Sequence, residues 1–150
     1  MPQAVPFPSV DWFRQLADRM NENRARQEQL GYVDCVAGFR VKDGDDTFTV
    51  QVTFEEFEAT DVHEAGAGEA ARADFTLEAD LPTWRAMIES IAEGGGRPDL
   101  EQTLNRLSHM GTPISVVSDD PLRRDLYFRY NQSLQEFVNA SAGFETRFDA

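Results

Sequence analysis

The sequence is short of cysteine, lysine and positive charge, and each shortage excludes a class of protein. Cys35 is the only cysteine, so no intramolecular disulfide can form, which is compatible with a reducing compartment. The Lys and Arg side chains number 14, with Lys42 the only lysine, against 27 acidic ones, and the formal net charge is -13. Because such a charge repels phosphate backbones and anionic headgroups, we expect no nucleic acid partner.

Long apolar runs are also missing. No segment reaches the ~20 apolar residues that span a bilayer, and residues 1–9 lack the basic stretch and apolar run of a secretory signal. We therefore expect a cytoplasmic protein without stable membrane insertion. The acidity is typical of a solubility device, and a basic partner protein is the alternative interpretation.

What the chain does contain is enough apolar material for one core. Of its 150 residues 41% are hydrophobic, with 11 Phe, and no repeat or interdomain linker interrupts them. A chain of this size buries roughly 70% of its unfolded surface. We expect one domain over residues 1–150, with a core at about 10–140 and a tail at 142–150 that contains scattered apolar residues.

The first half predicts a helix followed by a hairpin. Apolar residues at helical spacing after Ser9, a plausible N-cap, indicate an amphipathic helix that ends before Gly31. From Val33 the apolar period becomes two, in two runs separated by residues 43–46, and polar residues occupy the other face. Helices should therefore cover one side of the sheet, and water the other. The apolar hairpin positions are Val33, Cys35, Ala37, Phe39 and Val41, then Phe48, Val50, Val52 and Phe54.

Weaker signals continue the sheet. A strand is expected near residues 57–62, joined through Glu55 and Glu56 either by a turn or by a bulge in one continuous strand. After a loop around residues 66–68, short strands are expected at 74–79 and 114–118.

Three further helices are predicted in the second half. One follows Asp80 and stops at Gly94, a second begins near Asp99 and stops at Gly111, and a long one begins at Pro121. Their apolar positions are Trp84, Met87, Ile88 and Ile91; Leu100, Leu104, Leu107 and Met110; and Leu122, Leu126, Tyr130, Leu134, Phe137 and Val138. The order helix, strands, helix, helix, strand, helix predicts an α+β domain with a mainly antiparallel sheet of about five strands, covered on one face by helices.

The residues that could carry chemistry form no catalytic constellation. The chain has no Gly-x-Ser-x-Gly elbow, and Cys35 lies mid-strand on the apolar face, where a buried thiol is expected. Neither His63 nor His109 has a second His or Cys at metal-ligand spacing. His63 is interpreted as part of a solvated strand end. We therefore expect no metal, no cofactor and no enzymatic activity.

One stretch resembles a known family. The run from Ala73 to Trp84, continuing to Ile91 and a glycine, is similar to the strand and helix segment of sterol carrier protein 2-like domains. The following helix, glycine, strand and C-terminal helix match as well, so the resemblance covers about residues 10–140. The chain departs from the family at 111–119, where the usual lysine and the second glycine are missing and one residue is added.

The resemblance implies an apolar tunnel between sheet and helices, which relatives use for fatty acyl chains, acyl-CoA, phospholipid or sterol, without catalysis or cofactor. On the matching segments, the implied wall consists of Trp84, Met87, Ile88, Ile91, Leu107, Met110, Val116 and Tyr130. We therefore expect non-catalytic binding or transfer of an apolar small molecule or lipid.

Two alternatives stay open. In the first, the same apolar surface and the Phe144/Phe148 tail dock onto an enzyme partner or a second copy, making the chain an interaction or accessory subunit. In the second, the chain is a cofactor-free enzyme acting on a steroid-like or acyl substrate, with His63 or a carboxylate as the base.

Overall fold

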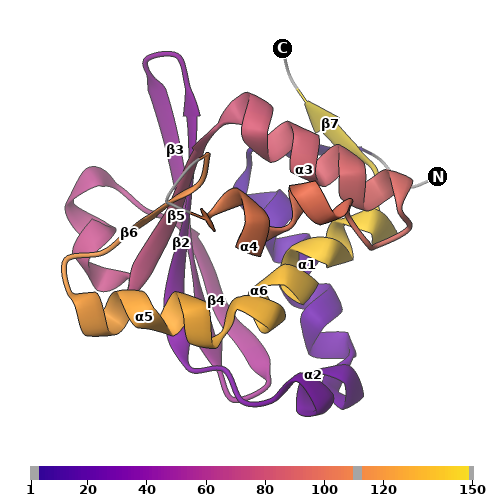
Figure 1. The fold of residues 1–150 in the computed structure, drawn as a ribbon, viewed down its shortest axis with the longest axis horizontal. Helices are drawn as coiled ribbons and strands as arrows, with labels where there is room; N and C mark the ends of the chain where they lie inside the picture. Colours follow the sequence, from indigo (N-terminus) through magenta and orange to yellow (C-terminus); the bar gives the residue numbers. More distant parts are fainter. Residues whose placement is uncertain (1–3, 110–112, 149–150) are drawn as a thin grey trace.

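The computed structural model describes residues 4–109 and 113–148 and has the expected α+β architecture (Figure 1). Its strands are β1 Val5–Phe7, β2 Cys35–Asp43, β3 Asp46–Glu55, β4 Glu58–Glu64, β5 Phe75–Asp80, β6 Ser115–Val117 and β7 Thr146–Phe148. Its helices are α1 Val10–Glu22, α2 Arg24–Leu30, α3 Leu81–Glu93, α4 Leu104–Leu107, α5 Pro121–Arg129 and α6 Asn131–Asn139, with short 3-10 turns η1 Ala67–Arg72, η2 Leu100–Gln102 and η4 Ala140–Gly143. Within these ranges no helix is long and apolar enough to cross a membrane.

The main sheet has five strands in the order β4-β3-β2-β5-β6. Every neighbouring pair is antiparallel except β2 and β5, which run parallel, so the prediction of a mainly antiparallel sheet is confirmed. β3 ends at Glu55 and β4 begins at Glu58, so Glu56 and Phe57 form the turn between them, and a bulge lies between Thr53 and Phe54 of β3. The turn is therefore confirmed at this join, and the alternative of one continuous bulged strand is wrong.

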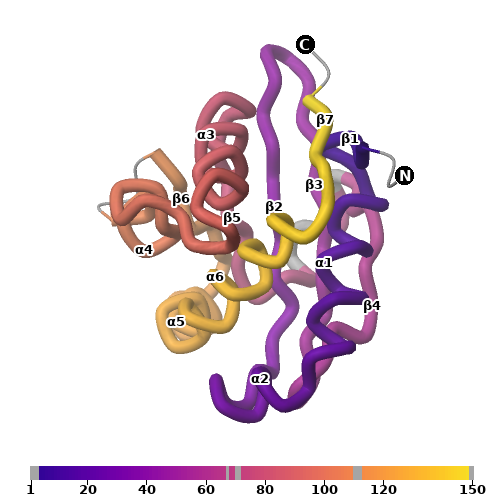
Figure 2. The backbone as a smooth tube through the Cα atoms, turned by 90° about the vertical axis from the view of Figure 1, so that its right-hand side faces the viewer, coloured from indigo at the N-terminus to yellow at the C-terminus, as the bar shows by residue number. Residues whose placement is uncertain are grey.

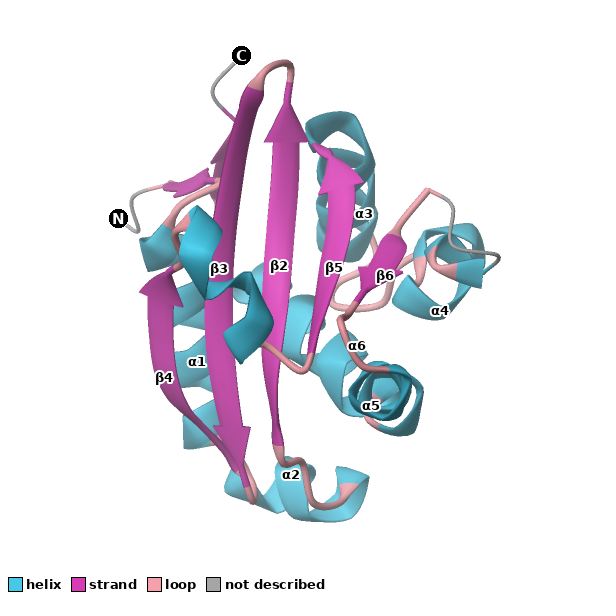
Figure 3. Ribbon diagram, turned by 90° about the vertical axis from the view of Figure 1, so that its left-hand side faces the viewer, coloured by secondary structure: helices cyan, strands magenta, loops and turns pink. Residues whose placement is uncertain are grey.

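The two faces of the sheet differ, as Figure 3 shows: helices lie behind the sheet and η1 in front of it. The apolar hairpin positions, such as Ala37, Phe39 and Val52, face the helices and are buried. The other face is not fully wetted, which corrects the expectation. Gln51 is buried there because η1 covers it, and its side-chain amide donates to the Glu69 carbonyl oxygen at 2.8 Å.

Three predicted helix starts are confirmed, but the predicted end of the first helix is wrong. The Ser9 hydroxyl accepts from the backbone N–H of Trp12, and Asp80 and Asp120 cap α3 and α5 in the same way. The first helix does not continue to Gly31, because Asn23 leaves helical geometry and separates α1 from α2.

Two later helices are shorter than predicted. The Thr103 hydroxyl accepts from the backbone N–H of Arg106 and starts a new one-turn helix, α4, which leaves Leu100 83% exposed instead of buried. The long final helix breaks at Tyr130, so α5 buries Tyr127 while α6 separately buries Leu134, Phe137 and Val138. Leu122, predicted as a core position, is 79% exposed.

The tail has a role that local patterns do not reveal. β7 pairs in parallel with β1, so the two ends of the chain form a second, two-stranded sheet, visible in Figure 2. Phe144 and Phe148 pack against the core, and the Phe148 ring lies 5.9 Å from that of Phe7. Both rings are half-buried, so the chain's own core holds part of each ring, and their docking onto a partner stays a prediction.

Candidate functional site

The four predicted wall residues of α3 all point into the core. Trp84, Met87, Ile88 and Ile91 recur at helical spacing on one face and are buried. The Trp84 indole N–H donates to the Arg40 carbonyl oxygen at 3.0 Å, which fixes the ring against β2.

The other wall residues come from α4, β6 and the break between α5 and α6. Leu107 and Val116 are 7% and 8% exposed, the highest values among the buried members, and Tyr130 is half-buried. Together with the α3 residues they form one apolar cluster, against which Tyr130 packs. Met110 lies outside the described residues.

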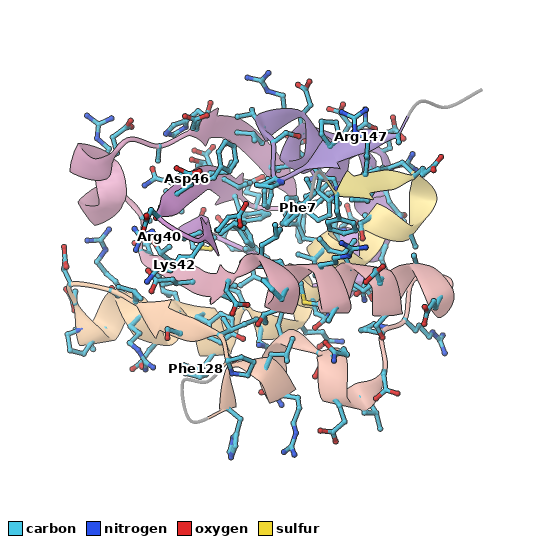
Figure 4. The ribbon with its side chains drawn as sticks, turned by 90° about the horizontal axis from the view of Figure 1, so that it is seen from above. Phe7, Arg40, Lys42, Asp46, Phe128 and Arg147 are labelled. Atoms are coloured by element: carbon cyan, nitrogen blue, oxygen red, sulfur yellow. The ribbon has the colours of Figure 1, made fainter. Side chains whose placement is uncertain are left out.

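The interior next to these residues is filled by side chains. Aromatic rings interleave there, with Phe39 5.1 Å from Phe13, 6.3 Å from Trp84 and 6.0 Å from Phe137 between ring centroids. Figure 4 places Phe7 in this interior and Phe128 toward the margin of the molecule. None of the wall residues lines any of the four surface hollows found in the described part of the chain.

Two of those hollows adjoin each other and share a cation. The first, about 430 Å³ in volume, lies between α1, α2, α6 and η4, and we call it the α1–α6 hollow. The second, about 680 Å³, lies between β1, α1 and the chain after η4, and we call it the β1–α1 hollow. Arg19 and Gly143 line both of them. Arg19 lies on the polar side of the first helix, and no local sequence pattern signals this juxtaposition.

The lining of the α1–α6 hollow is amphipathic. Its apolar part includes Met20 and Phe137, both buried members of the core. Its charged side chains are Arg19, Arg26 and Glu136, and Arg26 forms an ion pair with Glu136. The remaining lining residues are Asn23, Gln27, Gly95, Gly96, Asn139, Ala140, Ala142 and Gly143.

The chemistry-bearing residues lie apart from the predicted wall. The Cys35 thiol is buried, and burial, with smaller contributions from Asp74 and Asp34, raises its pKa to about 12. No cluster of His, Cys, Asp and Glu suited to a metal ion occurs among the described residues. The thiol is therefore an unreactive core group.

His63 is held on the opposite face of the sheet. His63, in β4, lies opposite Gln51 of the neighbouring strand β3. Its Nδ1 lies 2.6 Å from Asp61 Oδ2, and its Nε2 lies 3.4 Å from Glu69 Oε2. A ligand between the sheet and the helices could not touch this imidazole. For His63 to act as the base, a substrate would have to lie on the η1 side of the sheet.

Comparisons with known proteins identify the fold. Neither a family model nor a curated protein matches the chain. A crystal structure of sterol carrier protein 2 superposes with a TM-score of 0.66 at 17% identity, covering 91% of this chain and 97% of its own. A conserved hypothetical protein of Thermus thermophilus, suggested to be a sterol carrier protein, gives 0.65 at 16% identity, covering 97% and 95%. The sterol carrier protein domain 2 of Helicoverpa armigera gives 0.51 at 14% identity, covering 99% of each chain. The chain thus has a sterol carrier protein 2-like fold, as its sequence led us to expect.

Proposed function

We propose that this domain binds an apolar ligand between its sheet and its helices and releases it chemically unchanged. The ligand class is a fatty acyl chain, acyl-CoA, phospholipid or sterol, and the site is completed without a cofactor. The observation that carries the proposal is the shared architecture over 91% or more of the chain with proteins named as sterol carriers. The predicted wall of α3, α4 and β6 side chains belongs to one apolar cluster, which supports it. A cytoplasmic location is part of the same proposal.

A ligand must displace part of the helical cover, because the interior is filled. The shortest helix of the described chain, α4, has four residues and lies next to the segment that leads into β6, where the Ile114 N–H donates to the Leu107 carbonyl oxygen at 2.9 Å. Leu107 and Val116, the least buried wall residues apart from Tyr130, come from these two elements. We therefore place the way in between α4 and β6, where the fewest packed side chains have to move.

Native mass spectrometry of the purified chain, followed by organic extraction, tests the proposal directly. We expect a bound apolar molecule, or saturable displacement of a fluorescent fatty acid by fatty acids, acyl-CoA or sterols. The proposal would be refuted if the purified chain carries no bound molecule and binds none of these competitors.

A bulky substitution at the proposed way in separates binding there from binding elsewhere. Leu107→Trp should obstruct the passage and weaken displacement by about tenfold or more, since overpacking costs ~1–3 kcal/mol. Leu122→Trp is the matched control, because Leu122 is an exposed helical leucine on the neighbouring α5. If both variants weaken ligand binding equally, or if neither variant weakens it, the α4–β6 location is contradicted.

Trp84 can report on the wall once the second tryptophan is removed. Trp12 is equally buried and would mask the signal, so the measurement uses Trp12→Phe. The fluorescence of Trp84 in that variant should change on saturation with ligand. An unchanged emission at full occupancy would place the ligand away from α3.

Apolar side chains exposed on α5 and β6 favour a second candidate, an interaction surface for a protein partner or a second copy. Phe128 is 51% exposed and Val117 41%, in addition to Leu122. Sedimentation at rising concentration tests self-association, which Phe128→Asp should abolish. If the chain is a monomer at every concentration and captures no partner, the interaction-surface candidate is refuted and ligand binding is the one function still proposed.

A further inference from the structure

α5 is the least buried of the longer helices in the second half of the chain. It buries Tyr127 alone among its nine residues, whereas α3 and α6 bury four residues each. Figures 1 and 3 show α5 on the outside of the helical layer. Most of its side chains therefore face away from the rest of the molecule.

The exposed side chains of α5 form one stripe. Leu122 is 79% exposed and Phe128 51%, and Asp125 and Arg129 are exposed as well. Residues three, four and seven apart lie on the same side of a helix, so these four side chains are neighbours. We call them the α5 stripe. It combines two apolar groups with one negative and one positive charge.

The two charges of the stripe have no ion-pair partner. Asp125 precedes Arg129 by four residues, a spacing at which opposite charges can pair on one helix. Neither has an oppositely charged group within 4.0 Å among residues 4–109 and 113–148. The Arg129 guanidinium lies instead over the ring of Tyr130, with its Cζ 5.7 Å from the ring centre. Both charges are therefore available to another molecule.

The aromatic ring of the stripe is held by its own chain. The Cζ of Arg124 lies 5.3 Å from the centre of the Phe128 ring, a cation–π contact, and the Tyr127 ring lies edge-on to it at 5.1 Å between centroids. A ring that is already fixed loses little freedom when another surface covers it. Phe128 therefore suits the centre of an interface, where aromatic side chains are enriched.

The stripe is complementary to a copy of itself. A two-fold axis brings the same patch of two copies together, and across this axis the two α5 helices run antiparallel. Phe128 then lies near the axis, and Asp125 of each copy faces Arg129 of the other. The net charge of -13 on each copy acts over longer distances, and salt at about 0.15 M screens charges more than about 8 Å apart.

We infer that this chain associates with a second copy by packing the two α5 stripes antiparallel about a two-fold axis. The inference rests on the proposed interaction surface of α5 and β6, and it names the partner and the contacts. A helix of nine residues is about 13.5 Å long and buries less than the ~1,200 Å² of a stable complex. The dimer is therefore weak, with a dissociation constant of about 10–100 μM.

Sedimentation velocity of the full chain at about 5–500 μM and 0.15 M salt tests the inference. Asp125→Arg and Arg129→Asp each place like charges opposite one another across the axis, so each should weaken association by about tenfold or more. An equal mixture of the two variants should associate as the wild-type chain does, because one carries two positive charges in the stripe and the other two negative ones. The double variant Asp125→Arg/Arg129→Asp should also associate.

Arg72→Asp is the matched control. It makes the same change of net charge as Arg129→Asp, in η1 on the opposite side of the sheet (Figure 3). Its association should match that of the wild-type chain within about twofold. If it is weakened as far as Arg129→Asp, the effect is one of net charge and the inference is wrong. Restored association in the mixture shows at the same time that both single variants are folded.

The outcomes separate this inference from the functions on which it builds. A wild-type chain that stays monomeric at about 500 μM overturns it, and so does a mixture that stays monomeric. If Phe128→Asp abolishes the dimer while both charge variants keep it, the interaction surface stands and the antiparallel pairing is overturned. Displacement of a fluorescent fatty acid is measured separately, so ligand binding stands or fails by itself.

Discussion

The helical layer is packed differently at its two ends. At the aromatic end, formed by β1, α1, the middle of β2, the start of α3 and β7, rings interlock. The ring centroid of Phe7 lies 4.7 Å from that of Trp12, and that of Phe13 lies 5.1 Å from that of Phe39. At the α4–α5 end, residues 100–109 and 113–129, the cover consists of short helices that leave Leu100, Leu122 and Phe128 exposed. The difference indicates that the aromatic end holds the fold, whereas the α4–α5 end can rearrange at lower cost.

A polar network joins α4 to α5, in addition to the packing of the Tyr127 ring against Phe75, whose ring centroid lies 5.6 Å away. The Tyr127 hydroxyl lies 2.7 Å from that of Ser108 and 3.1 Å from the Leu104 carbonyl oxygen, all in the buried layer between α5 and α4. Burial raises the pKa of Tyr127, and the hydrogen bond with Ser108 opposes that rise in part. Each such bond contributes about 1 kcal/mol, less than a packed ring.

The largest contrast should come from truncating one ring at each end. Phe39→Ala removes a fully buried ring and should lower the free energy of unfolding by about 3–5 kcal/mol. Phe128→Ala removes an exposed ring and should change it by no more than about 0.5 kcal/mol. Urea denaturation of both variants measures the two values. Similar losses would remove the distinction between the ends.

Tyr127→Phe should have a smaller effect, about 1 kcal/mol, because it deletes only the hydroxyl of the network. A pKa raised in the folded state means that the tyrosine contributes stability below its ordinary value of 10.0, and that this contribution is lost as pH rises through the folded value. The wild-type chain should therefore lose more stability above pH ~10 than Tyr127→Phe does. Parallel pH profiles for the two chains would show that the hydroxyl is not stabilising.

The smallest change in stability is expected for Leu122→Cys, a variant that allows thiol labelling to compare the two regions. In Leu122→Cys the new thiol is exposed on α5 and should react with a maleimide at the rate of a free cysteine. Cys35, buried in β2 with its pKa raised to about 12, should react only after denaturation. Mass spectrometry should find one added group on the native variant and two on the unfolded one. Rapid labelling of Cys35 in the native chain would mean that the core opens.

Much of the fold could be predicted because the signals are local. The period of two in residues 33–54 predicts the hairpin, and the caps Ser9, Asp80 and Asp120 predict three helix starts that the structure confirms. Helix ends were less predictable. The breaks at Asn23 and Tyr130 carry no glycine or proline, and they allow successive segments to bury different faces.

The candidate sites were predictable only in part. Helical spacing alone predicts that Trp84, Met87, Ile88 and Ile91 share one face, and the structure places all four in the core. Spacing carries no information on whether that core is hollow, since the answer depends on how rings from α1, β2 and α6 fill it. Arg19 was missed because the two hollows that it lines form between segments that only folding brings together.

The sequence by itself determined the order of elements, the apolar face of the sheet and the inert setting of Cys35, because these follow from periodicity and capping within a few residues. Tertiary structure decided what distant segments do together. It paired β1 with β7, packed one side of Phe144 and Phe148 against the core, laid η1 over Gln51 and left Arg19 beside Gly143. Such contacts join residues far apart in the chain, and packing selects them through shape and charge, which no local pattern encodes.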